Sequence, residues 1–340
     1  MTSNTSKFGT WKQWKRDALR MHYQGKSHQE IADALVKPYF TITSHLRRHR
    51  ESYPQEYVSQ YYGYLENPER KSDLFINPQV LTRSTPTPTR KPTIFVIGDT
   101  QCKQGLSLDY MHWVGSYIAR KKPDIIVHVG DHYDMNSLSS YDKGQLSAEG
   151  RRVKSDIEAG DKGLEIIESY IKSVEGYKPR KVVTLGNHEE RIDRFVSYNP
   201  EFEGFLGTDK LAFSTYGWEV SPFLKPISIC GINFVHYLAN PMTGKPFGGT
   251  ALNRLKNVGE SYVMGHQQLF DYAERPLQLS GRKQLGIVVG ACYEHDEGYK
   301  GYQGNHHFRG CVMLYECSDG YALHKNITLQ HMKELYEGSL

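Results

Sequence analysis

Short apolar runs that each end in a glycine and a polar residue constrain this chain more than any other feature. The runs at residues 94–97, 125–129 and 182–185 lead into Gly98-Asp99, Gly130-Asp131 and Gly186-Asn187. Stretches with helical periodicity, at residues 108–119 and 149–174, separate them. This alternation predicts an α/β unit in which a parallel sheet carries helices on its faces. After residue 227 the pattern is mainly β, with strands expected at residues 227–237, 261–265, 284–291, 310–316 and 321–327.

Residues that can bind metals follow these runs and two later ones. His236 follows an apolar run, and Gly265-His266-Gln267-Gln268 ends another. Ligands of open α/β sheets lie beyond the carboxyl ends of the strands, so these separate segments are expected to meet at one edge. Carboxylate and amide oxygens and imidazole nitrogens are ligands for divalent cations. Two cations can share one carboxylate, and Asp131 is the natural candidate for that bridging position.

Five motifs in this order resemble those of the calcineurin-like metallophosphoesterases, whose pattern is DxH, GDxxD, GNH[DE], H and GHxH. The resemblance covers about residues 93–330. It implies a two-sheet β-sandwich flanked by helices, and an active site with two divalent cations. One implied metal site takes Asp131, Asn187, His236 and His266, and the other takes Asp99, Gln101, Asp131 and Gln268.

The same resemblance implies metal-dependent hydrolysis of a phosphoric ester, by in-line attack of a metal-held hydroxide. His188 would protonate the leaving oxygen as the general acid. Asp134 would hydrogen-bond His188 and hold its charged form. The chain contains no GxSxG motif, the pattern typical of a serine nucleophile.

Four further side chains are candidates for substrate binding, and each has a plain structural alternative. Arg191 and Arg194 follow the GNHEE segment and can clamp a phosphate, or can be solvated helix residues paired with neighbouring acids. His307 and Arg309 belong to a Gly- and Tyr-rich segment that either reaches the substrate or forms a polar surface loop.

Two positions depart from the family pattern. Gln101 stands where DxH has its histidine, and Gln268 stands where GHxH has its last histidine. Both belong to the same implied metal site, which would then be rich in oxygen ligands and favour Mn²⁺ or Mg²⁺ over zinc. The alternative interpretation is that this first metal site is weak or empty.

A small helical domain with three expected helices precedes this region. Ser27 and Glu30 match a capping box at the start of the second helix, Pro38 is expected to end that helix, and the third begins near Thr41. The segment from Gly25 to Leu46 resembles a helix-turn-helix, whose last helix enters the major groove of DNA. The candidate DNA-binding residues are Thr41, Thr43, Ser44, Arg47, Arg48 and Arg50.

Positive charge is concentrated in this N-terminal domain. Residues 1–51 hold ten Lys and Arg and four acids, which leaves 32 of the 42 bases and 34 of the 38 acids for the rest of the chain. A basic surface attracts the phosphates of nucleic acid, so DNA is the expected partner. A helical module for protein binding or oligomerisation is the alternative.

A proline-rich stretch sets the expected boundary between domains. Prolines alternate with other residues from Ser84 to Pro92, and this pattern prevents a helix and favours extended chain. The expected division is therefore an all-α helix-turn-helix domain at residues 1–55, a linker at residues 56–92 and an α/β phosphoesterase domain at residues 93–340.

Membrane association and export are not expected. No apolar run approaches the ~18 residues of a membrane span, and the N-terminus lacks the apolar core of a signal peptide. The five cysteines are odd in number and form no CxxC pair, which favours reduced thiols in a cytoplasm. The motif string is also similar to phage-encoded members of the superfamily, and for such a protein the host cytoplasm is expected. The oligomeric state stays open.

These features together favour a phosphodiesterase, a nuclease that its own DNA-binding domain tethers to DNA. A phosphomonoesterase acting on a protein or a small molecule would have the same metal core. A DNA-binding regulator with a degenerate phosphoesterase domain, in which the two glutamines are lesions, is the third hypothesis.

Overall fold

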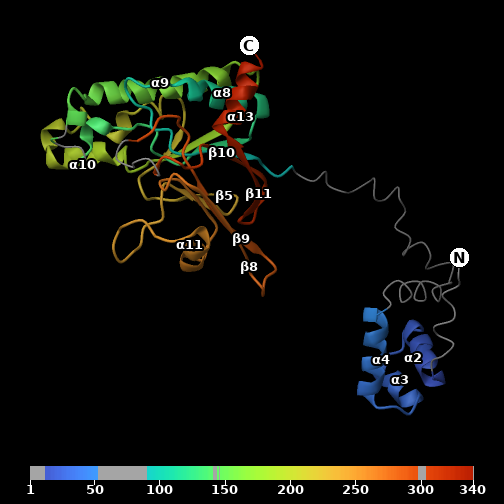
Figure 1. Ribbon diagram of the computed structural model, residues 1–340. Coiled ribbons are helices and arrows are strands. Elements are labelled where there is room, and N and C mark those ends of the chain that lie inside the picture. The colour runs from blue at the N-terminus through green and yellow to red at the C-terminus, as the bar shows by residue number, and fades with distance from the viewer. Residues whose placement is uncertain (1–11, 53–89, 141–143, 145, 298–303, 340) are drawn as a thin grey trace. The chain divides into compact units, whose positions relative to one another are not determined.

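The computed structural model describes the chain except for residues 1–11, 53–89, 141–143, 145, 298–303 and 340 (Figure 1). The chain divides into two compact units, Met1–Thr89 and Arg90–Leu340. Nearly all of the predicted linker at residues 56–92 lies outside the described residues, so the linker stays a prediction.

The N-terminal unit contains α2 (Gln13–Tyr23), α3 (His28–Ala34) and α4 (Tyr39–Ser52). The predicted capping box is present at the start of α3, because Ser27 and Glu30 bond reciprocally through side chain and backbone. Pro38 does not end that helix as predicted. The helix ends earlier, where Val36 takes a left-handed conformation with φ 48°, and Pro38 instead precedes α4. The core of the unit consists of Ala18, Leu19, Ile31, Ala32, Ile42 and Leu46.

Two sheets form the C-terminal unit, and they confirm the predicted two-sheet architecture flanked by helices. The strand order in the first sheet is β11-β10-β1-β2-β3-β4, and in the second it is β5-β6-β7-β9-β8. The first sheet consists of β1 (Ile94–Ile97), β2 (Ile125–His128), β3 (Arg180–Thr184), β4 (Glu219–Ser221), β10 (Gly310–Ser318) and β11 (Tyr321–Thr328). The second consists of β5 (Ile227–Ile229), β6 (Ile232–Val235), β7 (Tyr262–Met264), β8 (Phe270–Pro276) and β9 (Lys283–Val289).

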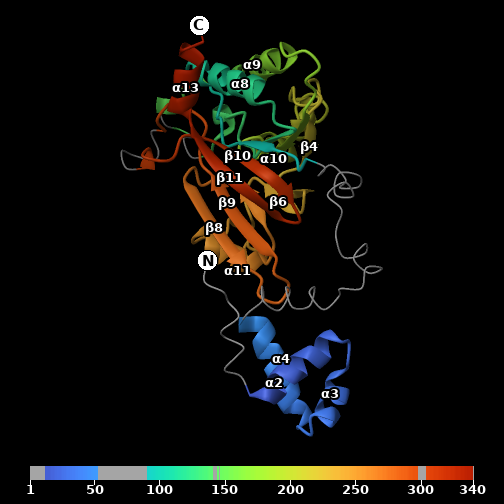
Figure 2. The ribbon, with the colours of Figure 1, turned by 90° about the vertical axis from the view of Figure 1, so that its right-hand side faces the viewer.

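Helices cover the outer faces of both sheets (Figures 1 and 2). The α-helices are α8 (Asp109–Lys121), α9 (Val153–Lys172), α10 (Glu190–Tyr198), α11 (Ala251–Val258) and α13 (Leu329–Glu337). Short 3-10 helices are η1 (Asn136–Leu138), η2 (Leu146–Ala148), η3 (Pro200–Phe202) and η4 (Thr208–Lys210). Among the described residues, no helix combines the length and apolar character that crossing a bilayer requires.

Three buried clusters hold these layers together. Val96, Val127 and Ile287 belong to the cluster between the two sheets, because alternate residues of each strand face the opposite sheet. Phe95 and Ile97 face the other way, toward a cluster that includes apolar residues of α8, α9 and α13. A smaller cluster packs α11 against the outer face of the second sheet.

The strand register brings the predicted motifs to one edge. Strands β1, β2 and β3 run parallel, and Ile97 pairs with His128, which pairs in turn with Val183. In the second sheet, β6 and β7 also run parallel, with Val235 opposite Met264. Each polar motif follows directly after one of these strands, so the motifs leave the sheets side by side.

Some elements differ from the sequence-based expectation. The expected strand at residues 227–237 is a hairpin of β5 and β6, because Cys230 and Gly231 both take positive φ values, of 53° and 78°. Strands β4 and β8 and helices α11 and α13 were not predicted.

Candidate metal centre

Four side chains of the implied second metal site lie around one point. Asp131, His236 and His266 offer ligand atoms that all lie within 4.8 Å of one another. His236 Nε2 lies 2.9 Å from Asn187 Oδ1 and 3.4 Å from Asp131 Oδ2. These donors come from three different strand ends and from the loop after β7, so the fold rather than sequence proximity assembles the site.

A backbone contact orients His236 toward this point. Its Nδ1 lies 2.8 Å from the Val129 carbonyl oxygen, which accepts a hydrogen bond from the N–H at that position and leaves Nε2 to face Asp131 and Asn187. A hydrogen bond from the ring nitrogen that does not bind the cation is the usual way in which a protein fixes the tautomer of a metal-binding histidine.

Electrostatics concentrate negative charge on Asp131. Burial opposes ionisation of Asp131, but His188 and His236 outweigh it and hold its pKa below the usual range. Burial also opposes the charged form of His236, and Asp131 outweighs it and raises the pKa of His236 to about 9. Burial and then His236 lower the pKa of His266 to about 4, so its imidazole is neutral and has a lone pair for a cation. Protons and cations compete for the same atoms here.

The residues of the implied first metal site also point inward, and several of their atoms lack partners. Asp99 and Gln101 are fully buried. Within the described residues, Asp99 Oδ2 and both polar atoms of the Gln101 side chain have no hydrogen-bond partner. Buried polar groups of this kind are costly unless something satisfies them, and a cation bound there would do so. Gln268 differs, because its Oε1 accepts a hydrogen bond of 2.7 Å from the Tyr293 hydroxyl.

The backbone is strained at four predicted ligands. Gln101, Asp131, His266 and Gln268 have φ values of 40°, 55°, 66° and 57°, a left-handed region that such side chains seldom adopt. Strain of this type persists only where the surrounding fold enforces it, and it is concentrated at functional sites.

Two glycines allow the ligands to approach the backbone. A Cβ on Gly186 would lie 2.1 Å from Asp131 Oδ1, and one on Gly265 would lie 2.5 Å from Asp99 Oδ1. Any larger residue at either position would displace a predicted ligand carboxylate, which explains why the motifs contain glycine there.

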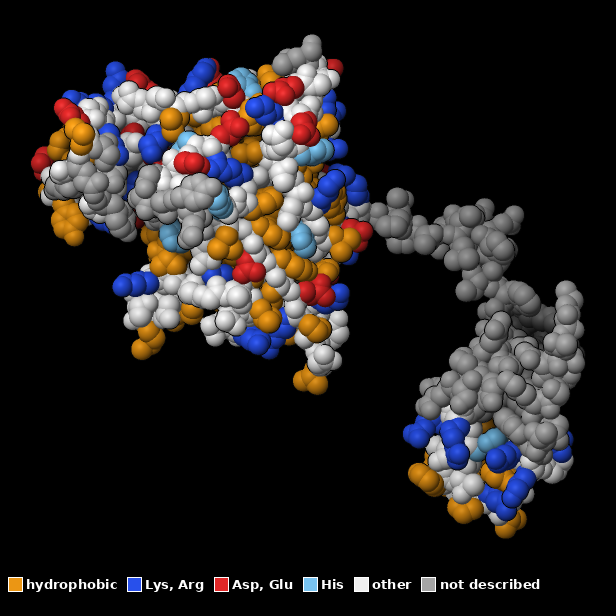
Figure 3. Space-filling model, in the orientation of Figure 1, with side chains coloured by type: hydrophobic (Ala, Val, Ile, Leu, Met, Phe, Trp, Pro, Cys, Tyr) orange, Lys and Arg blue, Asp and Glu red, His pale blue; other side chains and the backbone are white. Residues whose placement is uncertain are grey.

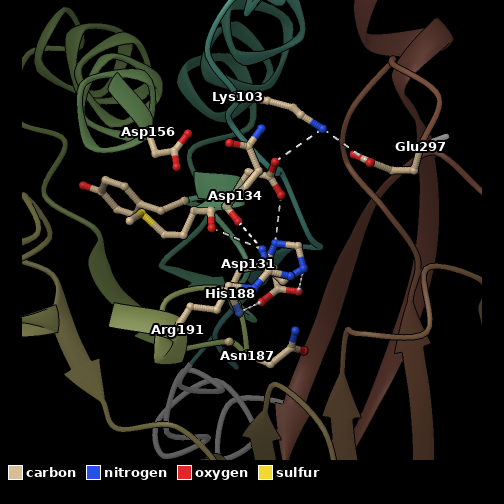
Figure 4. Close-up of polar contacts among 12 residues, drawn as sticks. Lys103, Asp131, Asp134, Asp156, Asn187, His188, Arg191 and Glu297 are labelled. Atoms are coloured by element: carbon tan, nitrogen blue, oxygen red, sulfur yellow. Dashed lines mark hydrogen bonds and ion pairs between the residues drawn. The ribbon is translucent and has the colours of Figure 1, made fainter. Parts of the chain in front are cut away.

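His188 and Asp134 form the predicted pair beside these ligands (Figure 4). His188 Nδ1 lies 2.9 Å from Asp134 Oδ1, and His188 Nε2 lies 3.6 Å from Asp131 Oδ2. Burial disfavours the charged imidazole, but the two aspartates outweigh it and raise the pKa of His188. The arrangement fixes the ring with Nε2 directed at the metal-binding residues.

Lys103 and Glu297 extend this pair, and sequence analysis did not single them out. Lys103 Nζ lies 3.5 Å from Asp134 Oδ2 and 3.4 Å from Glu297 Oε2. Dashed lines in Figure 4 mark both ion pairs. Glu297 in turn lies 2.8 Å from His295 Nε2. Lys103 therefore adds positive charge behind Asp134 and restrains the carboxylate that holds His188.

Glu189 is a third residue that sequence analysis missed, although its chemistry is distinctive. Its buried carboxylate accepts hydrogen bonds from the backbone amides of Gly186, Asp131, His132 and Tyr133, at 2.6 to 3.0 Å. One side chain thereby joins the loop after β2 to the loop after β3. The acidic residue after GNH was the available sign of this role.

We expect Glu189→Gln to lower the free energy of unfolding by about 2–4 kcal/mol. A glutamine side chain has only one acceptor oxygen, and its NH2 group would face backbone N–H groups that also donate. Thermal and urea unfolding of the metal-free protein would measure the loss. Glu190→Gln, at a half-buried neighbouring position, is the matched control. Equal stability of the two variants would contradict the assigned role.

We also expect Gln101→His to shift metal preference toward zinc, because imidazole nitrogen is a softer ligand than amide oxygen. Activity and metal content across Mn²⁺, Mg²⁺, Co²⁺ and Zn²⁺ would measure the shift. Gln104→His places the same substitution at a nearby exposed position and serves as the control. An unchanged metal profile would mean that Gln101 does not bind a cation.

The four predicted substrate-binding residues have different surroundings. Arg191 donates to the carbonyl oxygen of Asp134 at 2.8 Å, so it braces that loop. Arg194 is exposed and lines an open cleft beside the metal ligands. Arg309 donates to the carbonyl oxygens of Tyr293 and Glu294 and pairs with Asp296, so the structure ties it to its own loop, away from the cleft that Arg194 lines.

His307 lies at the edge of the same loop. Its Nδ1 lies 3.3 Å from the Gly304 carbonyl oxygen, and its ring centroid lies 5.6 Å from that of Tyr293. Tyr293 in turn donates to Gln268 Oε1, so this tyrosine lies between His307 and a predicted ligand of the first metal site.

The candidate DNA-binding residues lie on α4. Arg47 and Arg48 are exposed, while Thr41, Thr43 and Ser44 are half-buried. Thr43 Oγ1 lies 3.4 Å from His28 Nδ1, so it helps to join α4 to α3. The side chain of Arg50 lies outside the described residues. Lys and Arg side chains outnumber acidic ones on the face of this unit that Figure 3 shows.

Comparison with known proteins agrees with this geometry. A family model described as calcineurin-like phosphoesterase matches residues 92–277. Gene 54 protein of Mycobacterium phage L5 is 27% identical over 198 residues, which cover 56% of this chain and 75% of the relative. Gene 54 protein of Mycobacterium phage D29 is 27% identical over 179 residues, which cover 51% of this chain and 68% of the relative.

Proposed function

This chain belongs to the calcineurin-like phosphoesterase family, and from that premise we propose that it is a phosphodiesterase that cleaves DNA. Members of the family are metal-dependent phosphoric ester hydrolases with a dinuclear divalent centre. The observation that carries the proposal is the cluster of Asp131, His236 and His266 next to the His188–Asp134 pair. The phage relatives support a site of action in a host cytoplasm.

Two cations fit the donors that the chain presents. Asn187, His236 and His266 would hold one, Asp99, Gln101 and Gln268 the other, and Asp131 would be shared. We propose Mn²⁺ or Mg²⁺, because Asp99 and the two glutamines supply oxygen ligands. When bound, the cations would supply Lewis acidity toward a phosphoryl oxygen and would activate water.

The residues of the chain itself position the proton that the leaving group needs. Asp134 holds His188 through Nδ1, so Nε2 is the atom that would carry the proton to the leaving oxygen. Lys103 restrains Asp134 from behind, and Arg191 fixes the backbone of the same residue. His188 is thereby pre-oriented by three contacts that do not involve substrate.

The N-terminal domain supports DNA as the substrate. Its α4 presents Arg47 and Arg48 to solvent, and a basic helix of this kind can contact phosphates. A domain that binds DNA would raise the local concentration of phosphodiester bonds at the catalytic domain.

Substrate assays separate this proposal from its competitors. We expect hydrolysis of bis(p-nitrophenyl) phosphate and of DNA with Mn²⁺ or Mg²⁺, and little hydrolysis of p-nitrophenyl phosphate. Preference for the monoester would favour a phosphomonoesterase. DNA binding without turnover under any cation would favour a regulator with a degenerate catalytic domain.

We further expect the double variant Arg47→Ala and Arg48→Ala to weaken DNA binding and to reduce the slope of log K against log salt by about 2, because each lost phosphate contact removes about one unit. Fluorescence anisotropy over a salt series would measure it. The adjacent pair Arg120 and Lys121, at the end of α8, provides a matched double-alanine control. Equal slopes for both double variants would contradict DNA contact by α4.

A further inference from the structure

A cleft of about 700 Å³ opens beside the metal centre, and its chemistry indicates what it binds. Asn187 and His266 reach it from the predicted metal site. Its other lining residues include Arg194 and Tyr198 of α10, Phe223, Tyr237 and Lys245. A volume of this order suits a ligand of several hundred daltons, such as one or two nucleotides.

Two cations in the cleft are available to a ligand. Within the described residues, neither the Arg194 guanidinium nor the Lys245 ammonium has a hydrogen-bond or ion-pair partner, and both residues are exposed. Glu190 and Asp193 also line the cleft, but Asp193 accepts hydrogen bonds from the Thr208 amide and hydroxyl at 3.0 and 2.7 Å. With Arg191 included, bases exceed acids among the lining residues.

Aromatic side chains extend from the metal centre along the cleft. The ring of Tyr237 lies 4.6 Å from that of His266, and Phe223 meets Tyr237 edge-on at 5.5 Å. Tyr198 is 81% exposed at the rim. Tyr237 is buried and Phe223 is half-buried, so Tyr198 is the ring whose face a ligand can reach. An exposed aromatic ring beside unpaired cations is typical of surfaces on which the bases of an unpaired strand stack.

We propose that this cleft binds the unpaired strand next to the scissile phosphate, with a base against Tyr198 and neighbouring phosphates at Arg194 and Lys245. The proposal rests on the proposed function and narrows its substrate to single-stranded DNA segments. Bases within a duplex stack on one another and do not offer a free face to a tyrosine, so this cleft discriminates against paired DNA. Arginine and lysine then bind the backbone without reading sequence.

The test compares three substrates with the full-length protein: a single-stranded oligonucleotide, the same strand annealed to its complement, and bis(p-nitrophenyl) phosphate. We expect the wild type to prefer the single strand. Tyr198→Ala should lower kcat/KM on the single strand about ten-fold, the order expected for one lost stacking contact. The double variant Arg194→Ala and Lys245→Ala should lower it at least as much. In both variants the loss on the small diester should be several-fold smaller, because that substrate has no flanking nucleotide.

Lys256→Ala, on the exposed face of α11, removes a charge that does not line the cleft and is the matched control. Equal cleavage of single and double strands, or equal losses on the oligonucleotide and the small diester, would overturn this inference while leaving the phosphodiesterase intact. Absence of wild-type activity on every diester would instead overturn the proposed function.

Discussion

Asp131→Asn is expected to lower kcat/KM by more than about 100-fold and to reduce the bound cations from two per chain to one or none. Partners outside the ligand set commonly change metal affinity or activity 10- to 100-fold, so loss of a shared ligand should exceed that range. An asparagine keeps the shape and one oxygen, but its neutral amide does not bridge two cations or balance their charge. Metal content after dialysis, measured by mass spectrometry beside diester hydrolysis, would test both parts.

Asp131→Asn should leave the other contacts of the site in place. Asp131 Oδ1 accepts the His188 backbone amide at 2.9 Å, and the asparagine oxygen can keep that bond. Asp209→Asn, at an exposed position of the same domain, is the control for a lost carboxylate. A metal content of two cations per chain in Asp131→Asn would contradict the assignment of Asp131 as a ligand shared by the two sites.

Much of the fold could be predicted because its central strands are buried on both faces. Every residue of β1 and β2 is buried, so each strand is a continuous apolar run that stands out in the sequence. Strand β8 lies at the edge of its sheet, and Ala273 is its one buried residue. Its charged residues conceal its β character in the sequence. Helix α11 is similarly concealed, because its buried face includes Arg254.

The metal ligands could be predicted because each follows a recognisable strand end, and parallel strands bring such ends together. Lys103 and Glu297 could not, because 194 residues separate them and neither stands in a motif. Their proximity depends on how the loop after β9 folds over the loop after β1. Glu189 was passed over for a different reason. The motif marks it as an acidic residue, but its partners are backbone amides, which no side-chain identity reveals.

The substrate cleft shows the same limit of sequence analysis. Arg191 and Arg194 are three residues apart on one helix and appear equivalent in the sequence. The fold turns Arg191 to the carbonyl oxygen of Asp134 and leaves Arg194 exposed in the cleft. Only the packing of α10 against the loop after β2 distinguishes a bracing arginine from one that is free to meet substrate.

His188→Ala is expected to lower kcat on DNA by about 10²- to 10⁴-fold, the usual contribution of a general acid, while the metal content stays near that of the wild type. Metal should stay because Asp131, Asn187, His236 and His266 do not depend on the His188 side chain for their placement. The loss should be much smaller on bis(p-nitrophenyl) phosphate. A nitrophenolate leaves readily without a proton, whereas a sugar alkoxide does not, so only the latter needs the acid.

This dependence on leaving group separates proton donation from other roles of His188. A histidine that only binds the phosphoryl group would contribute equally to both substrates, because both present the same diester. His188→Asn, which retains a polar group, provides a second variant should the alanine lower stability. Equal losses on DNA and on the small diester would therefore reassign His188 to substrate binding. Full activity of His188→Ala on DNA would show that His188 takes no part in the reaction. The positioning roles proposed for Asp134 and Lys103 would then be wrong as well.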